Sequence, residues 1–228
     1  MATNVYSKFN DVDAVMSSAK NRLNQIEIEY QKSLNDKKIP VALLVDIKAY
    51  LGDIRSALDY LNTRIVNSDR YFPICNHVNY FSSHYGAVDT VTKSVLEKFQ
   101  PYSGNDIIKW FNILNNKNKH VTLVPQIRKE TLETRVTHPS GGGVSWTQGV
   151  TFGAGVSVMG VPIDPRTQLP VQNNVVKTER IIWVDFVFES SVAPTELPNN
   201  LSALPFLKKS FENISTVIAE VEKTLLNS

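Results

Sequence analysis

The chain lacks several features that would place it in a specialised class of protein. It has one cysteine, Cys75, among 228 residues, so it forms no disulfide within itself and does not fit the disulfide-rich secreted class. Its longest dense apolar stretch, residues 181–188, contains Asp185 and is far shorter than the roughly 20 residues that a membrane-spanning helix needs. Residues 1–10 lack the apolar core of a secretory signal. We therefore expect a cytoplasmic protein with no membrane partner.

A large excess of charge of one sign is also missing. Lys and Arg number 24 and Asp and Glu number 22, which gives a formal net charge of +2. This balance does not support the concentrated basic face of many nucleic-acid-binding proteins, although a small local patch stays open. Hydrophobic residues make up 42% and charged residues 20%, as in a globular protein that buries a sizeable core in one or two domains.

The first half of the chain shows helical periodicity. Apolar side chains recur every three or four positions over residues 12–34 and again, without interruption, over residues 44–65. Pro40 separates the two stripes, which predict an antiparallel helical hairpin. Residues 67–86 are less regular and are expected to form a connector pressed onto the bundle.

Two more helices are predicted before residue 121. A third helix is marked by the apolar residues Val88, Val91, Val95 and Phe99 and ends at Pro101. A fourth is expected to run to His120, opened by a capping pair of Ser103 and Asp106. The sequence thus predicts an N-terminal bundle of about four helices.

After residue 120 the apolar period changes from about three and a half to two, which is typical of β-strands. Leu123, Pro125 and Ile127 are expected on one face of an edge strand, and the glycines at 141–143 in a hairpin turn. Over residues 144–158 even positions are mostly apolar and odd positions are Gly, Ser or Thr. This alternation predicts two strands with one apolar face and one face of small residues.

The remaining segments complete the predicted fold. We expect a proline-rich loop over residues 161–174, a central strand covered on both faces over 181–188, and an amphipathic C-terminal helix that covers the sheet or returns to the bundle. The fold class is α+β: an N-terminal helical bundle, an antiparallel β-sheet region and a C-terminal amphipathic helix. The expected domains are residues 1–120 and 121–228, with one continuous domain as the alternative.

The densest group of candidate site residues lies at the end of the fourth expected helix. His120 can act as a general base when neutral and as an acid or phosphate clamp when protonated, and Lys117 and Lys119 can neutralise phosphate charge. The same residues also fit a helix C-cap, because asparagine tolerates left-handed backbone and basic side chains favour the last turn. The asparagines of this group are Asn115, Asn116 and Asn118.

Arg55 and Asp59 form a second candidate group. They lie four residues apart at the border of the buried stripe of the second helix, and Asn62 continues the line. Arg55 could reach a neighbouring helix end, including the region of His120. The alternative is a helical ion pair that contributes only about a few tenths of a kcal/mol.

Other patterns argue against common kinds of site. Cys75, His77, His84 and His120 do not have the spacing of a zinc site, so we expect no metal and no cofactor. The glycines at 141–143 lack the Gly-Lys-Ser/Thr ending of a phosphate loop, and the sequence has no Gly-x-Ser-x-Gly elbow, so a hydrolase of that type is not expected. The small-residue face of residues 145–157 could dock a partner or another part of the chain.

Four segments resemble a pattern that recurs in uncharacterised bacterial proteins: residues 54–61 (IRSALDYL), 72–74 (FPI), 100–102 (QPY) and 114–120 (LNNKNKH). The shape of this region, about the first 125 residues, is also similar to the HEPN superfamily of small helical bundles. That resemblance implies metal-independent RNases that often work as dimers, in toxin–antitoxin or antiphage defence systems.

The HEPN signature is an arginine, commonly followed by a polar residue, and then a histidine four to six residues beyond the arginine. His120 matches the histidine and Asn116 the polar residue, but Asn115 stands where the arginine should be. The resemblance implies that the arginine would clamp the scissile phosphate, and asparagine carries no charge for this. Either catalysis is lost, or Arg55 supplies the cation from the second helix.

Two functions follow as hypotheses. The first is a non-catalytic HEPN-like interaction module that forms a homodimer or docks a protein partner. The alternative is a metal-independent HEPN-type endoribonuclease or RNA-binding protein. In its cleaving form His120 accepts the 2′-hydroxyl proton, Arg55 and Lys119 stabilise the charge of the phosphorane, Asn116 completes the site and Asp59 orients Arg55.

Overall fold

The computed structural model describes residues 9–68, 70–120, 123–171, 174–189 and 196–226, apart from the side chain of His120. The fold class is α+β, as the sequence predicts. The chain forms two compact units, which we call the helical unit (residues 1–127 and 186–228) and the β unit (residues 128–185). The C-terminal helix belongs to the helical unit. The division into domains at 1–120 and 121–228 stays a prediction.

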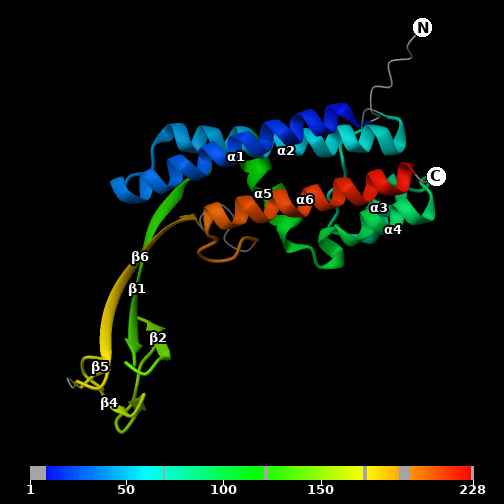
Figure 1. The fold of residues 1–228 in the computed structure, drawn as a ribbon. Helices are drawn as coiled ribbons and strands as arrows, with labels where there is room; N and C mark the ends of the chain where they lie inside the picture. Colours follow the sequence, from blue (N-terminus) through cyan, green and yellow to red (C-terminus); the bar gives the residue numbers. More distant parts are fainter. Residues whose placement is uncertain (1–8, 69, 121–122, 172–173, 190–195, 227–228) are drawn as a thin grey trace. The chain divides into compact units, whose positions relative to one another are not determined.

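The helical unit begins with the predicted antiparallel hairpin (Figure 1). Arg22 of the first helix lies 3.1 Å from Asp53 of the second (Nε–Oδ2), and Arg64 near the end of the second lies 2.7 Å from Asp11 near the start of the first (Nη2–Oδ2). The helices of the described residues are α1 (Asn10–Asp36), α2 (Val41–Val66), α3 (Val78–His84), α4 (Thr90–Lys98), α5 (Asp106–His120) and α6 (Ala203–Leu226), with a 3-10 turn at Pro101–Ser103.

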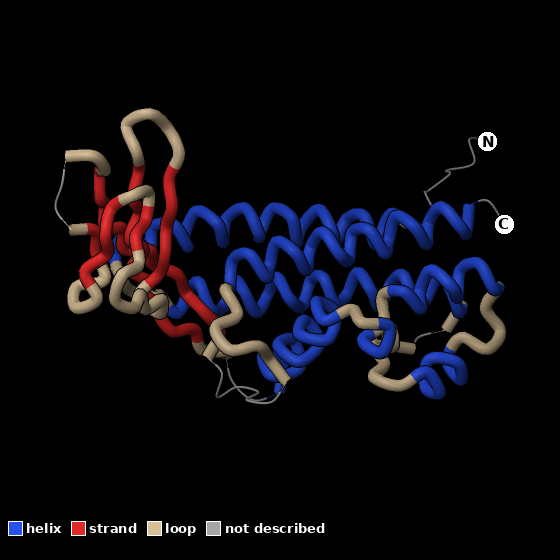
Figure 2. The backbone as a smooth tube through the Cα atoms, turned by 90° about the horizontal axis from the view of Figure 1, so that it is seen from below, coloured by secondary structure: helices blue, strands red, loops and turns tan. Residues whose placement is uncertain are grey.

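The buried stripe of α2 is wider than the sequence predicts. Tyr50 and Ala57 are fully buried beside the predicted seam, because α2 packs against α1, α5 and α6 rather than against one neighbour. Figure 2 shows the long helices of this unit side by side. Among the helices described, none combines the length and the apolarity that crossing a bilayer requires. The seam residues that are buried as predicted are Ile47, Leu51, Ile54, Leu58 and Leu61.

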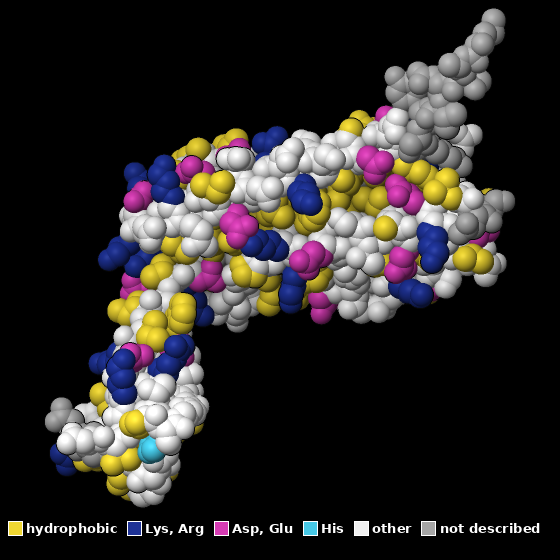
Figure 3. Space-filling model, viewed as in Figure 1, with side chains coloured by type: hydrophobic (Ala, Val, Ile, Leu, Met, Phe, Trp, Pro, Cys, Tyr) yellow, Lys and Arg dark blue, Asp and Glu magenta, His cyan; other side chains and the backbone are white. Residues whose placement is uncertain are grey.

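The C-terminal helix was expected either to cover the sheet or to return to the bundle, and α6 packs in the bundle. It packs against α1, α2, α4 and α5. The hydroxyl of Tyr50 donates a hydrogen bond to the carbonyl of Leu207 at 2.8 Å, and the hydroxyl of Thr92 donates to that of Thr224 at 3.1 Å. On the face of the helical unit seen in Figure 3, acidic and basic side chains are interspersed, in keeping with the small net charge.

Two details of the helical unit correct the sequence prediction. The expected connector at 67–86 contains the short helix α3, of which only Phe81 is buried, so it has no apolar stripe for a pattern search to find. The cap of α5 is Asn105, whose Oδ1 accepts a hydrogen bond from the Ile108 N–H at 3.2 Å. Ser103 lies in the 3-10 turn instead, so the predicted capping pair with Asp106 is wrong.

The described strands form two small antiparallel sheets. One has the order β2-β1-β6, and the other, which lies in the β unit, has the order β3-β4-β5. The predicted hairpin turn joins β1 to β2, and Gly141 and Gly142 have φ values of +101° and +87° that suit glycine, whereas Gly143 is already the first residue of β2. The strands are β1 (Gln126–Thr137), β2 (Gly143–Thr147), β3 (Ser157–Val158), β4 (Val161–Asp164), β5 (Leu169–Pro170) and β6 (Lys177–Phe188).

Several strand predictions are wrong. The expected loop at 161–174 contains β4 and β5, in which Val161 and Ile163 are buried. At the start of β1, Ile127 is exposed and Val124 and Gln126 are buried, so the inward face is the opposite of the predicted one. A backbone that leaves a helix can enter a strand in either phase, and the apolar pattern is too short to fix the phase there.

β6 is an edge strand and not the central one that its apolar residues suggested. Ile182 and Trp183 are exposed, and only residues 186–188 are buried. The rings of Phe186 and Phe188 pack edge-on against Tyr30 and Phe206 of the helical unit. The dense apolar run therefore reflects burial of one strand end rather than coverage of two sheet faces.

The alternation at 144–158 does not form two continuous strands. β2 ends at Thr147, and the chain turns until β3 begins at Ser157. Only Trp146 of this stretch is buried, in a small cluster with Val136 and Ile163. The small residues at odd positions from 145 to 157 are all exposed. Glycines at 149, 153 and 155 leave too few side chains to hold a strand in place.

Candidate functional site

A polar pocket in the helical unit collects residues from α2, α5 and the segment between α2 and α3. Its volume is about 460 Å³. It contains Arg55, Asn116 and Lys119, three of the five residues singled out from the sequence. We call it the α2–α5 pocket. Its lining residues are Arg55, Tyr71, Phe72, Ile74, Asn112, Asn116 and Lys119.

One face of α5 supplies the far wall of this pocket. Asn112, Asn116 and Lys119 stand four and three residues apart, a spacing that places side chains on the same side of a helix. Asn115 lies on another side and is 2% exposed. The position where the HEPN signature has its arginine therefore faces the interior of this bundle and not the pocket.

The predicted cluster at residues 115–120 has side chains in different surroundings at the end of α5. The Oδ1 of Asn118, which is buried, accepts a hydrogen bond from the Val124 N–H at 2.9 Å, so this asparagine ties down the chain beyond the helix. Asn116 and Lys119 line the pocket, and the interpretation of this group as a helix C-cap stays a prediction. The side chain of His120 lies outside the described part of the structure, so its distance from Arg55 and its role stay predictions.

Arg55 and Asp59 hold the backbone of Phe72 between them. Arg55 Nη2 lies 3.1 Å from Asp59 Oδ1 and donates a hydrogen bond to the Phe72 carbonyl at 2.7 Å. The Phe72 N–H in turn donates to Asp59 Oδ1 at 2.8 Å. The Arg55 side chain is only 11% exposed. The pair is therefore more than a surface ion pair along one helix: it fixes the segment that forms the near wall of the pocket.

Asn62, one turn further along α2, extends this anchoring. Its Nδ2 donates to the carbonyl of Arg70 at 2.8 Å and lies 3.4 Å from the carbonyl of Tyr71, and its Oδ1 accepts from the hydroxyl of Tyr85 at 2.8 Å. Asn62 is fully buried. Its alignment with Arg55 and Asp59 was visible in the sequence, but its backbone partners were not.

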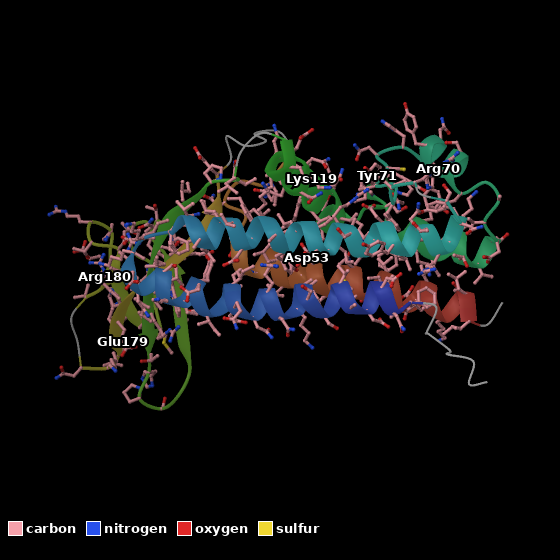
Figure 4. The ribbon with its side chains drawn as sticks, turned by 90° about the horizontal axis from the view of Figure 1, so that it is seen from above. Asp53, Arg70, Tyr71, Lys119, Glu179 and Arg180 are labelled. Carbon is pink, nitrogen blue, oxygen red and sulfur yellow. The ribbon has the colours of Figure 1, made fainter. Side chains whose placement is uncertain are left out.

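Tyr71 is the residue of the pocket that sequence reasoning missed. It is 74% exposed, although the backbone on which it stands is held on α2. Figure 4 shows Lys119, Tyr71 and Arg70 along one side of the helical unit, with Tyr71 between the two basic residues. Residues 67–74 have no regular apolar period, so the sequence does not indicate whether the Tyr71 ring is exposed or buried.

The electrostatic character of the α2–α5 pocket is cationic. Its described lining includes Arg55 and Lys119 and no carboxylate, although Asp59, 3.1 Å from Arg55 Nη2, compensates much of the charge of Arg55. Within the described residues, Lys119 takes part in none of the ion pairs, which involve Arg55 and seven other basic residues. The pocket is therefore suited to an anion, with amide groups of Asn112 and Asn116 as further donors.

A smaller pocket of about 380 Å³ lies next to the same segment. We call it the Arg70 pocket. Burial and the positive charge of Arg70 lower the pKa of His84. Its lining residues are Ile65, Val66, Asn67, Ser68, Arg70, His84, Ala87 and Val88, none of which is acidic.

The structure also shows where the candidate metal ligands and Cys75 lie. Over the residues that the structure describes, no three His, Cys, Asp or Glu side chains gather closely enough to hold a metal ion. Cys75 is buried, its pKa is raised by burial, and its N–H donates to Gln100 Oε1 at 2.8 Å. Its surroundings do not give it the lowered pKa of a reactive thiol.

Comparisons of the chain with protein-family models, with curated proteins and with solved structures give no match.

Proposed function

We propose that the protein is a non-catalytic HEPN-like module that binds RNA in the α2–α5 pocket. The observation that carries the proposal is the lining of this pocket, in which Lys119, outside the ion pairs of the described residues, stands with the Asp59-paired Arg55 and the exposed ring of Tyr71. The bacterial setting, a role in defence or toxin–antitoxin systems, a cytoplasmic location and a homodimeric state belong to the same proposal and rest on the resemblance to HEPN proteins.

The choice of RNA follows from the combination of groups. Lysine and arginine bind phosphate oxygens through charge-assisted hydrogen bonds, and the amides of Asn112 and Asn116 add neutral donors. An exposed aromatic ring next to such cations is the common arrangement for binding an unpaired nucleotide, because every base has a face that can stack. An inorganic anion would need the cations but not the ring.

The absence of catalysis is inferred from how the arginine is used. The guanidinium of Arg55 already contacts the Asp59 carboxylate and the Phe72 carbonyl, so its charge is largely compensated and its position is set by a structural role. Asn115 faces the interior, so the signature position offers no second cation to the pocket. This leaves Lys119 as the pocket cation outside the ion pairs of the described residues, and we propose that it holds a phosphate without the second uncompensated cation that would stabilise a developing phosphorane.

The proposal is tested by fluorescence anisotropy with a labelled single-stranded RNA of about ten nucleotides, within the usual span of single-strand sites. EDTA is present throughout. The variants are Lys119→Glu and, as a matched control, Lys117→Glu, a lysine two residues away on α5 that does not line the pocket. We expect Lys119→Glu to weaken binding by about tenfold or more, equivalent to about 1.4 kcal/mol, and Lys117→Glu to change it less than about threefold.

The RNA recovered after each titration is run on a denaturing gel beside RNA incubated with His120→Ala. Intact RNA with every protein supports a non-catalytic module. Cleavage by the wild type that His120→Ala abolishes contradicts the non-catalytic part and favours the endoribonuclease alternative. No binding by folded wild type, or equal loss in both lysine variants, contradicts the pocket as an RNA site.

A further inference from the structure

Two pockets flank one short segment of chain, and the described residues that line them include no carboxylate. Tyr71 and Phe72 line the α2–α5 pocket, and Arg70, the residue before them, lines the Arg70 pocket. Adjacent Cα atoms are about 3.8 Å apart, so the basic group of Arg70 and the ring of Tyr71 start from neighbouring points of the backbone. Lys119 lines the same pocket as Tyr71, and the three residues follow one another in the order Lys119, Tyr71, Arg70 in Figure 4.

The ring of Tyr71 stands on a fixed support. The carbonyls of Arg70, Tyr71 and Phe72 and the N–H of Phe72 are all held by side chains of α2. A ring that is mostly exposed on a backbone that cannot move freely loses little conformational entropy when a flat ligand stacks on it. The structure thus presents a preorganised stacking surface with a cation on either side.

The Arg70 pocket has the donors that a phosphate needs. Arg70 takes part in none of the ion pairs of the described residues. The Nδ2 of Asn62 lies 3.4 Å from Nε2 of His84, which also lines this pocket. The side chains of Asn67 and Ser68 also line this pocket.

We infer that the Arg70 pocket is a second phosphate subsite, and that one single-stranded RNA runs from Lys119 across the ring of Tyr71 to Arg70. The inference rests on the proposed RNA binding in the α2–α5 pocket and adds the path of the strand beyond that pocket. A base can lie on the Tyr71 ring only when it is unpaired, so a duplex does not fit this arrangement.

The test is the salt dependence of binding of the same single-stranded RNA. For a single strand, the slope of log K against log salt concentration changes by about 0.7 for each phosphate contact. We expect Lys119→Gln and Arg70→Gln each to reduce the slope by about 0.7, and the double variant by about 1.4. Arg166→Gln removes the same charge from an exposed arginine of the β unit and serves as the control, with an unchanged slope.

The stacking part is tested with Tyr71→Ala. This change is expected to weaken binding by about tenfold, within the range measured for loss of one base–aromatic stack, without changing the slope. The matched control is Tyr60→Ala, since Tyr60 is exposed and lies about 140° around α2 from Arg55. A duplex of the same sequence is expected to compete poorly with the labelled strand.

The outcomes separate the two proposals. If the folded wild type does not bind RNA, the proposed function fails and this inference fails with it. If Lys119→Gln weakens binding and lowers the slope while Arg70→Gln behaves like Arg166→Gln, only the second subsite is overturned. A Tyr71→Ala variant that binds as the wild type does, or a duplex that competes as well as the single strand, overturns the path across the ring.

Discussion

Replacing Asp59 by alanine tests whether the anchoring of the segment at Phe72 is a main structural element of the helical unit. The change removes the acceptor of the Phe72 N–H and the ion-pair partner of Arg55, while the bond from Arg55 to the Phe72 carbonyl is kept. Asp59 itself fills little apolar volume, so the effect comes from the lost polar contacts.

The magnitude follows from the burial of the two side chains. A hydrogen bond to a charged group contributes about 1.5–3 kcal/mol, and breaking a buried ion pair costs about 3–5 kcal/mol. The side chains of Arg55 and Asp59 are 11% and 22% exposed, so water recovers part of this loss. We expect Asp59→Ala to lower the free energy of unfolding by about 2–4 kcal/mol.

The assay is urea unfolding followed by far-UV circular dichroism, which reports mainly on the helices. A double-mutant cycle of Arg55→Ala and Asp59→Ala should give a coupling of about 1–2 kcal/mol. The control is the cycle of Arg64→Ala and Asp11→Ala, a pair whose side chains are 39% and 59% exposed and for which we expect at most about 0.5 kcal/mol. Equal coupling in the two cycles, or a loss below about 1 kcal/mol for Asp59→Ala, would refute the reasoning.

Two further predictions concern pH and backbone conformation. Because the pKa of His84 is lowered in the folded state, the unfolded chain takes up this proton first, and stability is lost as the pH falls below about 6.5. His84→Gln should therefore flatten the pH dependence of the urea midpoint on the acid side, and an unchanged profile would contradict this. In the β unit, Gly155 has a φ of +83° whereas Gly153 lies outside the left-handed region, and both have open space where a Cβ would stand. Gly155→Ala should lower the stability of the β unit by about 1 kcal/mol and Gly153→Ala by less than about 0.5 kcal/mol, measured by tryptophan fluorescence; equal effects would speak against backbone strain.

The long helices could be predicted from the sequence because their apolar stripes are long. The stripe of α2 over residues 44–65 spans about six turns and admits one interpretation, and the stripe of α6 is also long. Strands β4 and β5 have four and two residues, too few for a period of two to stand out beside prolines. The prediction that residues 181–188 form a central strand was wrong for a different reason. Only the end of the strand with Phe186 and Phe188 is buried, and the sequence pattern does not indicate which part of a strand is buried.

The site was predicted in part. Basic and amide residues on one face of α5 and a cation on α2 are readable from helical spacing, and the structure brings Arg55, Asn116 and Lys119 to one pocket. Tyr71 and Asn62 were not assigned a role, because their importance depends on hydrogen bonds to backbone carbonyls of a segment without regular structure. The inward position of Asn115 follows from the packing of α5 on its neighbours, which the motif alone does not specify.

The most direct test of RNA binding at this place is ultraviolet crosslinking of a uridine-rich single strand, followed by trypsin digestion and mass spectrometry. Cleavage after Arg70 and Lys93 releases residues 71–93 as one peptide, and cleavage after Arg180 gives a separate peptide that contains the exposed Trp183. We expect the crosslinked nucleotide on residue 71 of the wild type. The crosslink should persist in Tyr71→Phe, because phenylalanine keeps the stacking face. It should be lost when Lys119→Glu is combined with Tyr71→Phe. Crosslinks concentrated at Trp183, with none in residues 71–93, would contradict the account.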